Sequence, residues 1–179
     1  DSRIGIRGAD AASQLDNAQG NLSSRGSIDV AVSHVLNPLG TLIAGSALDL
    51  TADSLGGDGS LLSGGGLSLI IGQDFTNSRE ITANGHALIS TAGLLTNHGV
   101  LQAGDLDVRG TRINNSVTGE ISGTRTTVIA HDTLTNRGLI DGSQTRIEAD
   151  TLDNVGSGRL YGDRLAIRGG TISNREEDG

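Results

Sequence analysis

The chain has 179 residues, a net charge of −8 and 28 glycines. It has no cysteine, methionine or tryptophan and only one tyrosine and one phenylalanine, which excludes disulfides and thiolate metal sites and makes an ordinary aromatic-rich core unexpected. Its 13 cations are all arginines interspersed with acidic residues, so no basic patch is available for nucleic acid or an anionic membrane, and no stretch is apolar enough to span a bilayer.

One short phrase recurs from end to end: an apolar residue, any residue, then asparagine. The asparagines are Asn17, Asn37, Asn77, Asn97, Asn115, Asn136, Asn154 and Asn174, and Gly57 fills the single degenerate position. These nine anchors are spaced by 20, 20, 20, 20, 18, 21, 18 and 20 residues. A sustained period near 20 is typical of a solenoid.

Taken in chain order, the predicted elements begin with an incomplete coil at Ile4 and Ile6. The second anchor precedes the only proline, Pro38, at a turn. The glycine-rich stretch around residues 56–66 is expected to be a weakly laddered coil. It lacks the nine-residue tandem repeat of a calcium-binding nonapeptide and the lysine of a phosphate loop.

The clearest unit spans residues 95–112. Leu95, Asn97, Gly99, Leu101 and Ala103 alternate with mostly polar residues, and the alternation slips by one at a corner and resumes at residue 106. Period-two alternation in short runs predicts strands with one buried face, and glycine, aspartate, serine and arginine mark the corners. The unit that begins at residue 134 repeats this pattern.

Strands this short acquire a shared core only by stacking in parallel on the equivalent strands of neighbouring coils. We therefore predict an all-β chain, a right-handed parallel β-helix of about nine coils with three strand faces each and essentially no helix; parallel crossovers are strongly right-handed. At about 4.8 Å per coil the rod would be roughly 43 Å long. Residues 1–179 are expected to form a single repeat array cut from a longer filament, with a polar tail at residues 175–179.

The eight repeated asparagines should point inward by parity, where a buried amide must find hydrogen-bond partners. We predict that they stack as a structural ladder, interrupted at Gly57. Two coils carry two extra residues after the asparagine and should bulge outward there. Val117 and Val155, in these bulges, and Tyr161 are the candidate contact residues for a binding partner.

No catalytic, metal or cofactor site is expected. His34, His86, His98 and His131 lie in separate coils at non-equivalent positions, whereas a metal site needs converging ligands. The aspartate pairs at residues 105/107 and 150/153 leave open, as a remote alternative, a polysaccharide-active β-helix enzyme. Such an enzyme needs carboxylates flanking a sugar cleft with aromatic platforms, which this composition hardly provides.

Residues 134–140 (LTNRGLI), 94–104 (LLTNHGVLQAG) and 152–156 (LDNVG) resemble the roughly 20-residue haemagglutinin repeats of filamentous haemagglutinin and related exoproteins of two-partner secretion systems. The resemblance covers nearly the whole chain. Residues 158–163 (GRLYGD) and 171–176 (TISNRE) are similar to the branch that mediates contact-dependent growth inhibition.

This resemblance implies a β-helical filament on a Gram-negative cell surface, exported by an outer-membrane transporter. The partners implied are neighbouring repeats of the same chain, the transporter and a target-cell receptor, but not nucleic acid, and the segment would not insert into a membrane. Its expected function is a non-enzymatic stalk that projects a distal binding or toxin element. The alternative is a receptor-binding adhesion module that itself contacts the target cell; the polar outward residues favour the stalk.

Overall fold

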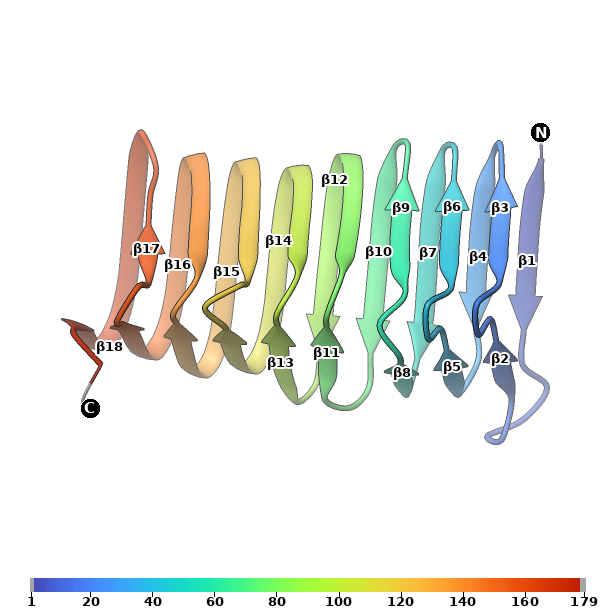
Figure 1. The fold of residues 1–179 in the computed structure, drawn as a ribbon, viewed down its shortest axis with the longest axis horizontal. Coiled ribbons are helices and arrows are strands. Elements are labelled where there is room, and N and C mark those ends of the chain that lie inside the picture. The colour runs from blue at the N-terminus through green and yellow to red at the C-terminus, as the bar shows by residue number, and fades with distance from the viewer. Residues whose placement is uncertain (1, 178–179) are drawn as a thin grey trace.

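The computed structural model describes residues 2–177 as a single stack of parallel coils (Figure 1). Its strands occupy three columns, and within each column every strand pairs in parallel with the equivalent strand of a neighbouring coil, with one interruption described below. No helix occurs in the described residues, so none could cross a membrane. The prediction of an all-β parallel solenoid of about nine turns is confirmed; its right-handed winding stays a prediction.

The first column, here called the asparagine face, carries the repeated phrase. Its separate strands are β2 (Gln14–Asp16), β5 (His34–Leu36), β8 (Ser54–Gly56), β11 (Phe75–Asn77) and β13 (Leu94–Asn97). In later coils the column is formed by the C-terminal parts of longer strands.

The second column follows the asparagine corner. It consists of β3 (Asn21–Ser24), β6 (Thr41–Ala44), β9 (Ser60–Ser63), β17 (Arg159–Leu160) and the first residues of β12 (Glu80–Thr91), β14 (Val100–Asn115), β15 (Glu120–Asn136) and β16 (Leu139–Val155). The long strands continue around the next corner, because each of them covers more than one face.

The third column lies behind the other two in Figure 1. It begins with β1 (Arg3–Arg7), β4 (Ser27–Ala31), β7 (Ala47–Ala52) and β10 (Gly66–Ile71) and ends with β18 (Arg164–Arg175). Between them it uses the later part of β12 and the central parts of β14, β15 and β16.

The core is one continuous aliphatic cluster along the axis of the rod. The predicted inward residues Leu101 and Val108 are fully buried, and Phe75 is the one aromatic side chain in this cluster. Corner glycines allow successive coils to approach closely: a Cβ at Gly99 would lie 1.8 Å from the carbonyl oxygen of Arg79 in the preceding coil. The narrow cross-section explains why a core with almost no aromatics is sufficient here.

Candidate functional site

The most regular polar feature of the rod is the ladder of buried asparagine amides. In each rung the Nδ2 group of one asparagine donates to the Oδ1 atom of the asparagine in the following coil. The donor–acceptor distances are 2.8 Å for Asn17–Asn37, 2.8 Å for Asn77–Asn97, 2.9 Å for Asn97–Asn115, 2.8 Å for Asn115–Asn136, 2.8 Å for Asn136–Asn154 and 2.7 Å for Asn154–Asn174. Asn97, Asn115 and Asn136 are completely buried, whereas Asn174, in the last coil, is exposed.

The same amides also hold the neighbouring corner in place. Asn97 Nδ2 donates to the Glu120 carbonyl at 3.1 Å, and Asn115 Nδ2 donates to the Leu139 carbonyl at the same distance. Asn97 and Asn115 therefore each join two coils through both an amide and a backbone carbonyl. With these partners the buried amides avoid the cost of an unmet hydrogen bond.

The two extended corners differ in a way that the sequence did not reveal. Val117 is 63% exposed, as an outward bulge requires. Val155 is only 1% exposed, so its prediction as an exposed contact residue is wrong. It is the last residue of β16 and pairs with Arg175 of β18, and Gly156 takes the next position with a φ of 59° and donates to the Arg175 carbonyl. The outward bulge of this corner thus starts at Gly156, one residue later than the sequence spacing predicted.

Tyr161, 53% exposed, stands at one end of a groove that runs along the axis over four coils. The groove has a volume of about 780 Å³. One wall is the outward column Gln102, Ser122, Asp141 and Tyr161, the other is formed by Thr124, Ser143 and Asp163 of the adjoining turns, and the floor is Ala103, Gly123, Gly142 and Gly162.

The lining of this axial groove is polar and acidic. Its charged residues are Glu120, Asp141 and Asp163. Two of its groups are already engaged: Ser122 donates to the Glu120 carboxylate at 2.7 Å, and Asp141 Oδ1 accepts from the Gly142 amide at 2.8 Å. Such a surface can offer hydrogen bonds and a single aromatic ring to a partner, but no set of aromatic platforms.

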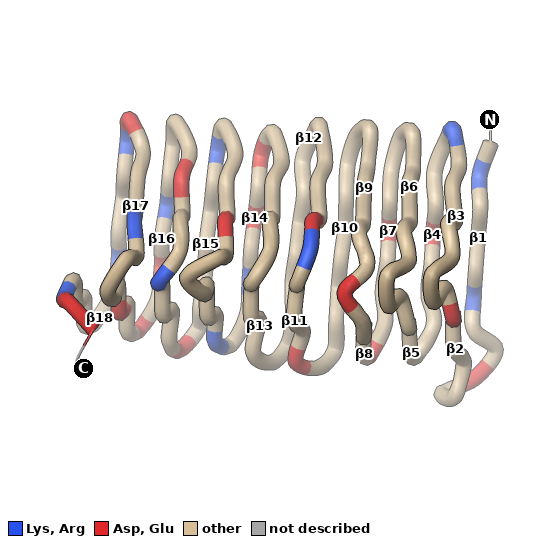
Figure 2. Tube along the Cα trace, viewed as in Figure 1, with Lys and Arg blue, Asp and Glu red and all other residues tan. Residues whose placement is uncertain are grey.

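Acidic residues occur along the whole rod, whereas residues 26–78 contain no arginine (Figure 2). On the third column the charges pair within and between coils: Asp29 accepts from Arg3 and Arg7 at 2.6 and 2.7 Å, and Arg125 lies 3.1 Å from Asp105. The hydrogen bond from Arg146 lowers the pKa of the half-buried Glu148 carboxylate. Exposed pairs of this kind contribute little to stability.

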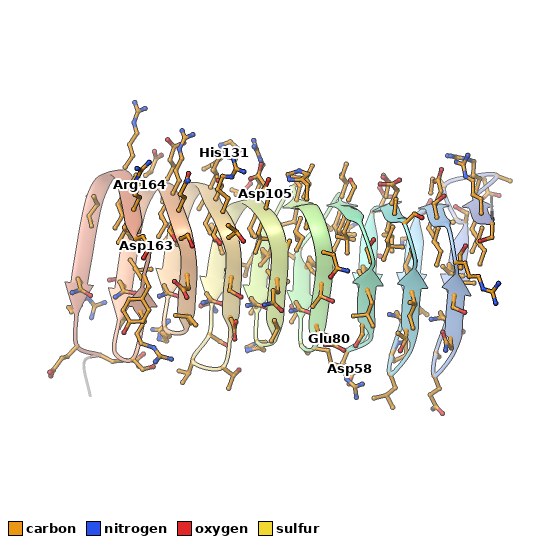
Figure 3. The ribbon with its side chains drawn as sticks, turned by 90° about the horizontal axis from the view of Figure 1, so that it is seen from above. Asp58, Glu80, Asp105, His131, Asp163 and Arg164 are labelled. Carbon is orange, nitrogen blue, oxygen red and sulfur yellow. The ribbon has the colours of Figure 1, made fainter. Side chains whose placement is uncertain are left out.

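The described residues include no cluster of three or more histidine or acidic side chains that could hold a metal ion. Figure 3 shows Asp58 and Glu80 on one side of the rod and Asp105 and His131 on the other. His34 and His98 instead bond to serines of the following coil, Ser54 and Ser116, each at 2.9 Å. The arrangement offers repeated stacking contacts rather than a convergent set of acid, base and nucleophile.

Sequence reasoning did not identify the axial groove. A signal was present, since Ala103, Gly123, Gly142 and Gly162 occupy equivalent positions before the turn in four successive units. Recognising a groove from these small residues would have required knowing which side chains flank them in the folded rod.

A stack of about nine parallel coils, joined by an asparagine ladder, defines a β-solenoid of roughly 20-residue repeats. The chain belongs to the haemagglutinin repeat family, whose model matches residues 7–58, 47–99 and 100–176.

Among known proteins the chain is similar to the deoxyribonuclease CdiA of Dickeya dadantii (strain 3937). The two are 35% identical over 122 residues, which is 65% of this chain but only 4% of that much longer relative. No solved structure matches the chain significantly.

Proposed function

We propose that this segment is a non-enzymatic stalk in a large secreted exoprotein of a Gram-negative cell surface. The observation that carries the proposal is how the repeats use their side chains: inward residues stack in the core and the amide ladder, and outward residues are mostly polar. The match to 4% of a long relative supports a segment of a longer filament. Family membership supports export by an outer-membrane transporter of a two-partner system.

The nuclease activity in the name of the CdiA relative belongs to that protein. In our proposal any comparable toxin of the parent protein resides outside the repeats, and the stalk holds a distal binding or toxin element away from the producing cell. A rod suits this task because each coil adds about 4.8 Å of length through contacts made mainly with its neighbours.

The axial groove supports a second candidate function, that the segment itself binds a target-cell receptor. The groove and the exposed side chains of Tyr161 and Val117 are the surfaces such a receptor would contact. Exposed aromatic side chains are common anchors of interfaces, but a single ring in a wide polar groove provides little apolar area to bury. We therefore rank the stalk first.

Binding measurements distinguish the two functions. We expect the purified segment to show no saturable binding to target cells, and the changes Tyr161→Ala and Val117→Ser to leave cell binding by the full-length parent protein unchanged. Circular dichroism of each variant serves as the folding control. Saturable binding by the segment that Tyr161→Ala removes, in a variant that is still folded, would replace the stalk with the receptor-binding function.

A further inference from the structure

The asparagine face contains a seam between β8 and β11. Strands β2, β5 and β8 form a three-stranded sheet of their own, and β11 pairs with β13 but not with β8 among the described residues. The other two columns continue across the same coils, because β9 and β10 both pair with β12. The seam therefore opens one face of the rod while the remaining faces stay hydrogen-bonded.

The amide ladder is interrupted at the same place. Gly57 occupies the anchor position with a φ of 101°, and a Cβ there would lie 2.4 Å from the backbone nitrogen of Pro38. An asparagine side chain could not be accommodated without moving the preceding coil. The interruption is thus built into the close packing of Gly57 against the Asn37–Pro38 peptide.

The loss of this rung leaves two buried amides incompletely bonded. Asn37 is 2% exposed and its Oδ1 accepts from Asn17, but its Nδ2 group donates to no protein group among the described residues and is not fully enclosed, so a water molecule can reach it. In the coil on the other side of the seam, Asn77 Oδ1 accepts only a long hydrogen bond of 3.4 Å, from the backbone amide of Arg79. A polar group that lacks a protein partner at such a site is commonly satisfied by an internal water.

A small cavity lies between these amides, with a volume of about 10 Å³. It is lined on the polar side by Asn37, Gly57 and Asn77 and on the apolar side by Leu55, Leu61 and Phe75. A void of roughly 10–15 Å³ is the size that holds one water molecule. Both Asn37 and Asn77 line this space, so it brings two side-chain amides to the position that a water would occupy.

We propose that the seam is a hydrated joint: it binds one buried water molecule at Asn37 Nδ2, and it is where the asparagine face opens before the rest of the rod. Opening there breaks no backbone pairing between β8 and β11, whereas opening elsewhere on this face must separate paired strands such as β11 and β13. The continuous second and third columns act as the hinge. The rod would bend there by widening the asparagine face.

Hydrogen exchange of the unmodified chain tests the opening. Segments with weaker local hydrogen bonding exchange faster than well-paired segments of the same protein. We expect the amides of Leu55 and Thr76, which face the seam, to exchange at least about tenfold faster than those of Leu95 and Thr96, the equivalent positions where pairing is intact. Equal protection of the two sets would show that the joint does not open preferentially.

Nuclear magnetic resonance tests the water. The Asn37 side-chain amide should show a through-space contact with a long-lived water, whereas the Asn97 side-chain amide, bonded to Asn115, should show none. As a matched pair, Asn37→Leu should lower the melting temperature less than Asn97→Leu, since only Asn17 loses an amide partner in the first case and both Asn77 and Asn115 lose one in the second. Absence of the water contact, or an equal fall in both variants, would overturn the hydrated joint.

Discussion

Deletion of residues 95–112 should leave a folded rod that is one coil shorter. In the intact chain Leu95 is in register with Ile113 and Asn97 with Asn115, so the shortened chain continues from residue 94 into an equivalent strand. Asn115 would then take the place of Asn97 beside Asn77. Because each coil contacts chiefly its neighbours, the remaining interfaces are preserved. Circular dichroism should retain the β-sheet spectrum, and small-angle scattering should show a rod shorter by about 4.8 Å.

The control is removal of only residues 95–103. This deletion takes away an asparagine rung and the second-column strand of one coil, and the following strands can no longer align with their partners. We expect it to unfold or aggregate. If both deletions were tolerated equally, the coil would not be the unit of folding.

In the parent protein, the stalk function predicts that target-cell activity falls gradually as whole coils are removed, and abrupt loss on deletion of this one coil would contradict it.

Replacing Asn97 by leucine should destabilise the segment by about 1–3 kcal/mol, the cost of leaving buried hydrogen-bonding groups without partners. Asn97 accepts from Asn77 and donates to Asn115, and all three side chains are nearly or fully buried. Leucine can fill the volume but satisfies neither amide. The shift would be measured by chemical denaturation together with thermal melting, since long repeat arrays need not unfold in a single step.

Asn174→Leu is the matched control for the ladder. Asn174 accepts from Asn154 at 2.7 Å but is exposed, so water can replace the lost partner. Its effect should be well below that of Asn97→Leu. A midpoint unchanged in both variants would show that the amide ladder does not stabilise the rod.

The repeat phrase and the alternation of side chains were sufficient to predict the fold, because in a strand the parity of each residue determines whether it faces the core. Leu101, Val108 and the anchor Asn136 are buried as that parity requires. The prediction for Val155 was wrong because Val155 lies at a corner, where side chains no longer alternate between inward and outward. There the direction of the side chain depends on the pairing with Arg175 and on the φ of Gly156, neither of which can be counted from spacing.

Two other features escaped the sequence for a related reason. The degenerate anchor Gly57 indicated a missing rung, but not that β8 and β11 would also fail to pair, since pairing depends on how closely two coils approach at that corner. The axial groove likewise depends on lateral placement: Asp141 and Tyr161 belong to different coils and become neighbours only through the stacking. Spacing along the chain predicts the stack, whereas the shape of its surface requires coordinates.

The asparagine rungs all point the same way: in each of the six asparagine–asparagine bonds the Nδ2 group donates toward the C-terminal end of the rod. Aligned amides polarise one another, so a row of them acts as a dipole with its positive end in the direction of Asn174. A coil joining at that end must present an acceptor, and a coil joining at the Asn17 end must present a donor. The rod therefore has a chemical polarity, and each finished coil offers the next one along the chain a donor already aimed at it.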